Sequence, residues 1–150
     1  DLHLAFAGRT GEPEFEDQVK AMVKNAGLEG RVHFLGGRSD MVQIMDSLSL
    51  LIVPSVIEAC PLAVLEAMSR GKAVIAADVG GLPEMVEHNG SGLVIARDPS
   101  VWAEAMASLI ENPKKLKAMG ERGKIVAEEK FSVRAMLAGL EAVYREAVQR

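Results

Sequence analysis

The order of segments along the sequence predicts an α/β domain: a doubly wound, mostly parallel sheet followed by a helical C-terminal tail. Short apolar or β-branched runs alternate with longer segments of helical periodicity, which is the pattern of strands joined by crossover helices. The run at residues 48–53 is almost continuously apolar, as expected of a parallel strand covered on both faces. Only helical patterns follow residue 112. We therefore expect one Rossmann-like domain over residues 1–150, with a core at about 1–112 and a tail at 113–150.

Five segments are expected to be strands, because each is short, apolar and bounded by Gly, Pro, Ser or Asp. They are residues 2–7, 32–35, 48–53, 73–76 and 93–96. Apolar residues at helical spacing, often with Pro near the start or Gly after the end, predict the helices. These are expected at residues 15–26, 41–46, 61–70, 83–87, 98–110, 114–119, 121–130 and 132–149.

The last of these helices has a clear start and a clear apolar face. Ser132 is expected to be its N-cap. Its apolar residues recur at helical spacing and form one stripe: Leu137, Leu140, Val143, Tyr144 and Val148.

A doubly wound domain normally opens with a strand and a helix that form the middle of its sheet, and no such segment precedes Leu2. We therefore expect the chain to be a fragment of a longer protein that lacks this first strand and helix.

Composition narrows the class of protein. The chain has 150 residues, 49% of them hydrophobic, which is enough for a buried core and excludes a disordered chain. Its single cysteine, Cys60, excludes a disulfide scaffold. Lys+Arg 17 against Asp+Glu 21 gives a formal charge of −4, which argues against a general nucleic-acid binder. No apolar run reaches the ~20 residues of a membrane span. We expect a cytoplasmic protein.

Ligands of open parallel sheets bind outside the carboxyl ends of the strands. The loops that follow the first four predicted strands are therefore expected to converge on one edge and to form a nucleotide cleft. They are residues 8–11, 36–39, 54–61 and 78–81.

The third loop carries most of the chemistry. It leads from a strand into the helix near Pro61, so the amides around Cys60 to Val64 are expected to make an anion site at the positive end of that helix. Glu58 lies before the helix and Glu66 lies on it. Two carboxylates repel a simple phosphate, but a carboxylate can accept both hydrogen bonds of a vicinal diol. A sugar, a phosphate and a ribose in a row are the parts of a nucleotide-sugar. Taken alone, each carboxylate is equally compatible with a solvated surface position.

The segment 54–68, with Glu58 and Glu66 eight positions apart, resembles the Glu-x7-Glu region of the GT-B retaining glycosyltransferases, the glycosyl transferases group 1. The resemblance continues in order through residues 71–76, 79–84 and 89–94, and it includes residues 32–36 upstream and parts of the tail. It implies that the chain is the C-terminal, donor-binding half of a GT-B fold, from an enzyme of polysaccharide or glycolipid biosynthesis. The acceptor would be held by a missing N-terminal domain, and the fragment alone would be inactive.

The resemblance also implies roles for individual residues. Glu58 would be the catalytic residue, in contact with the hydroxyls of the donor sugar, and Glu66 would bind the ribose diol. The backbone from Ala59 to Leu62 would hold the sugar and the diphosphate. The full set of donor-binding residues implied is Glu66, Ala59, Cys60, Pro61, Leu62, Gly8, Gly36, Arg38 and Ser55.

No cofactor and no metal are expected, because the sequence has no Asp-x-Asp pair and its histidines are scattered. The expected partners are a nucleotide-diphospho-sugar and, through the missing domain, an acceptor sugar or lipid; no nucleic acid is expected. A peripheral membrane contact of the longer protein and an oligomer of the fragment both stay open. Two other functions stay open as well: a nucleotide-sugar epimerase or phosphorylase of GT-B architecture, and a non-catalytic α/β assembly module.

Overall fold

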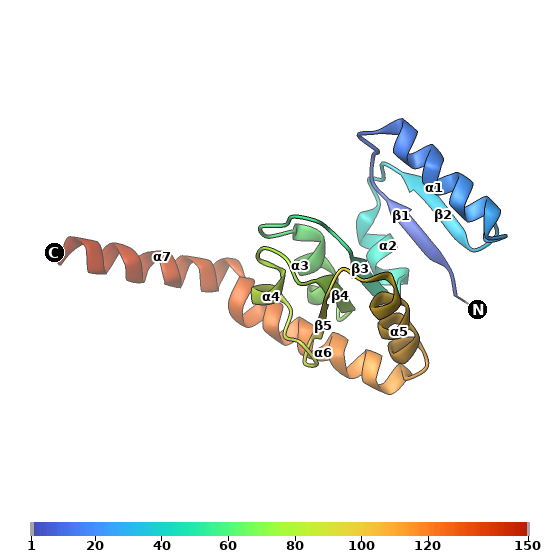
Figure 1. The fold of residues 1–150 in the computed structure, drawn as a ribbon. Coiled ribbons are helices and arrows are strands. Elements are labelled where there is room, and N and C mark those ends of the chain that lie inside the picture. The colour runs from blue at the N-terminus through green and yellow to red at the C-terminus, as the bar shows by residue number, and fades with distance from the viewer. Residues whose placement is uncertain (1, 150) are drawn as a thin grey trace. The chain divides into compact units, whose positions relative to one another are not determined.

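The computed structural model describes residues 2–149, which form two compact units divided between Val42 and Gln43 (Figure 1). The first unit contains β1 (Leu4–Ala7), α1 (Pro13–Asn25) and β2 (Val32–Gly36). Helix α2 (Met41–Ser47) starts at the end of the first unit and runs into the second. The α/β class, the parallel sheets and the helical tail are confirmed, whereas the organisation as a single domain stays a prediction.

The first unit is a parallel β-α-β arrangement. Strands β1 and β2 pair with Leu4 opposite Val32, and the rings of Phe6 and Phe34 stack with their centroids 5.2 Å apart. Helix α1 buries none of its residues. The predicted apolar face is therefore only partly covered: Phe15 stays 61% exposed, because two strands make a sheet too narrow to cover a whole helix face.

The second unit is built on a three-stranded parallel sheet in the order β3-β4-β5. Its strands are β3 (Leu50–Val53), β4 (Ala73–Ala77) and β5 (Gly92–Ile95), and its further helices are α3 (Leu62–Ser69), α4 (Leu82–Met85), α5 (Pro99–Ile110), α6 (Pro113–Phe131) and α7 (Val133–Val148). Every residue of the central strand β4 is buried, whereas β3 is half-buried. The strand covered on both faces is thus β4, and β3 is an edge strand of this sheet.

The core of the second unit lies between β4 and the helices around it. Ile75 of β4 packs in one cluster with Trp102 and Leu109 of α5 and Met119 of α6. The indole Nε1 of Trp102 donates a hydrogen bond of 3.0 Å to the carbonyl of Ala96, so its polar atom is satisfied inside the apolar surroundings. Helix α3 adds three fully buried residues, Val64, Ala67 and Met68, and packs against α6 and β4.

Helix ends follow the sequence signals closely. The Asp98 carboxylate caps α5 by accepting a 2.8 Å hydrogen bond from the Ser100 amide, and the Ser132 hydroxyl accepts one of 3.2 Å from the Ala135 amide at the start of α7. The prediction of a break near Gly120 is wrong, because residues 113–131 form the single helix α6. Gly120 is buried against the carbonyl oxygen of Gly71, which a Cβ atom would overlap. A close approach, not a helix end, explains this glycine.

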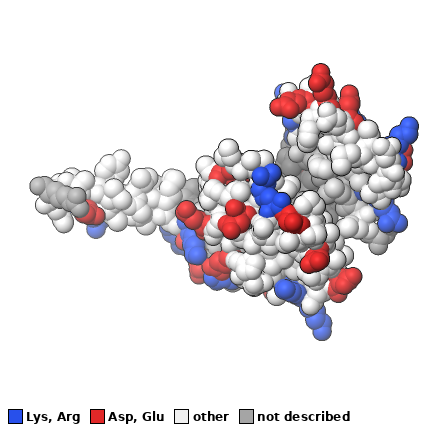
Figure 2. All heavy atoms as spheres, viewed as in Figure 1, with Lys and Arg blue, Asp and Glu red and all other residues white. Residues whose placement is uncertain are grey.

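Helix α7 continues from the end of α6 and runs away from the sheet of the second unit (Figure 1). Its substantial contacts within the described residues are with α6, and it buries none of its own residues. The predicted apolar stripe is therefore exposed, from 46% at Leu140 to 86% at Val148, and the visible face of α7 is mostly uncharged (Figure 2). No helix within residues 2–149 combines the length and the apolarity that a membrane crossing requires.

Candidate functional site

Glu58 lies in the loop between β3 and α3, at the carboxyl end of β3, and it is half-buried. Two hydrogen bonds fix this residue. The Ser55 hydroxyl donates to the carboxylate Oε1 over 2.8 Å, and the Gly81 amide donates to the backbone carbonyl of Glu58 over 3.0 Å. The carboxylate and the backbone of Glu58 are thus held by two different loops.

The start of α3 leaves backbone donors without partners. Pro61 is the N-cap, it makes no side-chain capping bond, and it has no N–H of its own. Within residues 2–149, the amides of Ala59, Cys60 and Leu62 have no hydrogen-bond acceptor. Unpartnered amides at the positive end of a helix favour an anion. The expectation of a free amide at Val64 is wrong, because that group donates to the Pro61 carbonyl over 3.0 Å.

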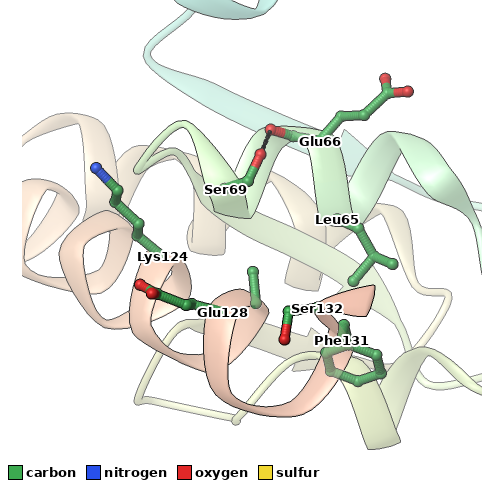
Figure 3. Close-up of a pocket in the computed structure, with 8 residues that line it drawn as sticks. Leu65, Glu66, Ser69, Lys124, Glu128, Phe131 and Ser132 are labelled. Atoms are coloured by element: carbon green, nitrogen blue, oxygen red, sulfur yellow. Dashed lines mark hydrogen bonds between the residues drawn. The ribbon is translucent and has the colours of Figure 1, made fainter. Parts of the chain in front are cut away.

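Glu66 lies one turn before the end of α3 and is exposed. A groove of about 430 Å³ runs between α3 and α6, and its lining includes Glu66, Leu65, Lys124 and Phe131 but not Glu58. Figure 3 shows that the Glu66 carboxylate points away from this groove, whereas Leu65 and Phe131 face one another across it. The groove is therefore largely apolar and does not bring the two predicted carboxylates together.

The remaining predicted site residues lie in the first unit. The Gly8 amide donates to the Gly36 carbonyl over 2.9 Å, so the loops after β1 and β2 meet. Arg38 is engaged by Asp40, through hydrogen bonds of 2.8 Å and 2.6 Å to its two carboxylate oxygens. The hydrogen bonds from the Arg38 guanidinium lower the pKa of Asp40 below its usual value.

The four loops meet in pairs: those at Gly8 and Gly36 in the first unit, and those at Glu58 and Gly81 in the second. Convergence of all four on one edge stays a prediction. Gly81 belongs to one of the loops expected at the cleft, but it is not among the predicted donor-binding residues. A Gly-Gly pair directly after a strand is a signal for close backbone approach, and could have indicated its contact with Glu58. Cys60 is exposed and is a free thiol. Among residues 2–149, no three His, Cys, Asp or Glu side chains are grouped closely enough to hold a metal.

Two curated bacterial proteins are similar to almost the whole chain. The D-inositol 3-phosphate glycosyltransferase of Corynebacterium glutamicum is 33% identical over 144 residues, which are 94% of this chain and 34% of that protein. The lipopolysaccharide core biosynthesis mannosyltransferase LpsB of Rhizobium meliloti is 31% identical over 149 residues, or 96% of this chain and 42% of that protein. The chain thus spans about a third to two fifths of the length of these relatives.

Solved structures agree in fold. Anabaena Alr3699/HepE in complex with UDP superposes with a TM-score of 0.89 at 28% identity, covering 97% of this chain and 41% of that one. The same Anabaena protein in complex with UDP-glucose gives a TM-score of 0.87 at 27% identity, with 96% of this chain and 41% of that chain covered. The family of glycosyl transferases group 1 matches residues 1–126. This chain, with its GT-B architecture and its loop of free amides before α3, belongs to the glycosyl transferases group 1.

Proposed function

We propose that this chain is the donor-binding part of a retaining glycosyltransferase. It holds a nucleotide-diphospho-sugar while the sugar passes to an acceptor sugar or lipid, which is bound by another part of a longer protein. The observation that carries this proposal is the set of unpartnered amides at the start of α3, next to Glu58, whose carboxylate accepts a hydrogen bond from Ser55 and whose backbone carbonyl accepts one from Gly81. The UDP and UDP-glucose complexes of the Anabaena relative, and the names of the curated relatives, support it.

The diphosphate binds the amides of Ala59, Cys60 and Leu62, where the dipole of α3 adds to their attraction. Pro61 contributes by fixing the backbone of the turn, because it has no N–H to donate. When the bond between the sugar and the diphosphate breaks, negative charge grows on the departing diphosphate. Donors that are already oriented stabilise that charge without reorganisation. We propose that this arrangement needs no metal, so transfer by the full-length protein should persist in excess chelator.

The two carboxylates bind different rings. Glu58 accepts hydrogen bonds from hydroxyls of the donor sugar, and the Ser55 hydroxyl keeps its carboxylate oriented. Glu66 accepts both hydrogen bonds of the ribose diol. In the first unit, the loops at Gly8 and Gly36, with Arg38, serve the nucleotide side of the donor.

Calorimetric titration of the full-length protein tests these roles, because UDP has the ribose and the diphosphate whereas UDP-glucose adds the sugar. Glu66→Gln should weaken the binding of both ligands by about tenfold or more, since a hydrogen bond to a charged group contributes about 1.5–3 kcal/mol. Glu58→Gln should weaken the binding of UDP-glucose and leave that of UDP unchanged.

The matched control is Glu104→Gln, which changes an exposed glutamate of α5 and should alter neither affinity. GDP and ADP, each with its glucose conjugate, are titrated in the same way, since the base is unknown. A wild-type protein that binds none of these ligands contradicts the proposal. Product analysis separates the alternative reactions. An epimerase changes the donor sugar without an acceptor, whereas a transferase needs one, and a phosphorylase forms a sugar phosphate from inorganic phosphate.

A further inference from the structure

The loop between β4 and α4 touches the Glu58 loop through two glycines. A Cβ atom on Gly80 would overlap the backbone carbonyl oxygen of Glu58, and one on Gly81 would overlap that of Ala59, both well inside the 3.0 Å that real Cβ atoms keep. The Gly81 amide also donates to the Glu58 carbonyl over 3.0 Å. Every group in these contacts is backbone, so no side chain can rotate to make room.

The core holds the glycine pair from both sides. Val79, directly before it, packs against the cluster around Ile75, and Leu82, directly after it, is fully buried. The Leu82 amide donates to the Val79 carbonyl over 3.2 Å, which closes the turn around the two glycines. Gly80 has a φ of +53°, a conformation that other residues adopt only with strain. The glycine pair is therefore a fixed surface against which the Glu58 loop rests.

The two carbonyls on this surface determine where two ligand-binding donors point. In a planar trans peptide, the C=O and the following N–H point in opposite directions. All peptide bonds between described residues are trans. The Glu58 carbonyl shares its peptide group with the Ala59 amide, and the Ala59 carbonyl shares its own with the Cys60 amide. Because both carbonyls face the glycines, both unpartnered amides face away from them.

We propose that Gly80 and Gly81 are positioning residues for the donor: they orient the amides of Ala59 and Cys60 toward the diphosphate. This inference rests on the proposed function. A methyl group at position 81 must push the Ala59 carbonyl back by roughly 1 Å, and the rigid peptide group then turns the Cys60 amide with it. The substitution should therefore weaken the binding of the diphosphate and leave the binding of the nucleoside unchanged.

The test compares Gly81→Ala with Gly120→Ala in the full-length protein. Both changes place a methyl group against a backbone carbonyl in the second unit, but the partner of Gly120 is Gly71, outside the Glu58 loop. The affinities for UDP and for uridine are measured for each variant that folds. If wild type binds another nucleoside diphosphate more tightly than UDP, that diphosphate and its nucleoside are used instead. Gly81→Ala should weaken UDP binding by about tenfold or more and change uridine binding less than about twofold. Gly120→Ala should change neither affinity.

A Gly81→Ala protein that binds UDP as tightly as wild type overturns the inference and leaves the proposed function standing. An equal loss of UDP affinity in Gly120→Ala also overturns it, because the effect would then be one of general destabilisation. Wild type that binds no nucleoside diphosphate overturns the proposed function itself. If Gly81→Ala does not fold, hydrogen exchange of the Gly81 amide is measured in the wild-type protein instead. UDP should slow this exchange, and an unchanged exchange rate counts against the inference.

Discussion

Replacing Gly120 with alanine should destabilise the second unit, although the same change in an isolated helix would stabilise it. Gly120 lies inside α6, where alanine is favoured over glycine by about 1 kcal/mol. In this fold, however, the added methyl group would overlap the carbonyl oxygen of Gly71. The two backbones must then separate, and overpacking of a well-packed site costs about 1–3 kcal/mol. Because the methyl group would meet backbone and not a side chain that can rotate, we expect the upper end of this range, about 3 kcal/mol, and hence a net loss of about 2 kcal/mol in the free energy of unfolding.

Two other helical glycines serve as controls. A Cβ on Gly123 would lie 3.5 Å from the Met68 Cγ, which is an ordinary contact, and a Cβ on Gly139 in α7 would meet nothing within 4 Å. Gly123→Ala should therefore be neutral or slightly stabilising, and Gly139→Ala should gain up to about 1 kcal/mol of helix stability.

Urea and thermal unfolding of the 150-residue chain, followed by far-ultraviolet circular dichroism, gives the order of the three variants. For a domain of this size, 1 kcal/mol corresponds to about 2–4 °C in Tm. Gly120→Ala should melt several degrees below wild type, whereas Gly139→Ala should retain or increase helicity. A Gly120→Ala protein as stable as wild type would refute the reasoning, because the contact between Gly120 and Gly71 would then tolerate a side chain.

Two further predictions concern single carboxylates. Asp98→Ala removes the cap of α5 and should cost about 1 kcal/mol in urea unfolding, whereas Glu12→Ala should cost little, because Glu12 caps α1 with no side-chain hydrogen bond; equal losses would contradict the capping argument. Hydrogen bonds of 2.7 Å and 2.8 Å from Arg122, with one from Lys130, lower the pKa of Glu87 below its usual 4.5. A lowered pKa in the folded state stabilises the protein above pH 4.5 and loses this effect as the pH falls through the folded value. Glu87→Gln should therefore lower Tm at pH 7 and approach the wild-type Tm at pH 3, and a difference that does not depend on pH would contradict this origin.

Most of the element order could be predicted, because the signals that set it are local. The apolar runs gave all five strands to within two residues, and Pro61, Asp98 and Ser132 marked the starts of α3, α5 and α7. A cap or a proline acts through its neighbours in the chain, so its effect is visible in sequence.

The differences arise where a residue depends on distant backbone. In the sequence, Gly120 indicates a helix end, and only the structure shows the Gly71 carbonyl that requires a glycine there. The exposure of Phe15 depends on the width of the sheet that α1 packs against, which the sequence of α1 does not contain. The predicted site shows the same division. The positions of Glu58 and the α3 start follow from the loop sequence, but the support that Gly81 gives to Glu58 comes from a loop more than twenty residues away.

Trp102 gives this chain an uneven optical response. It is the only tryptophan, it is 8% exposed, and it belongs to the core around Ile75, while the single tyrosine, Tyr144, lies on α7. Residues 1–42 contain neither chromophore. Intrinsic fluorescence excited at the indole band therefore reports melting of the second unit and is silent on the first. A single smooth fluorescence transition therefore reports unfolding of the core around Trp102 alone. Unfolding of the β1–β2 unit must be followed by a signal from the backbone, such as far-ultraviolet circular dichroism.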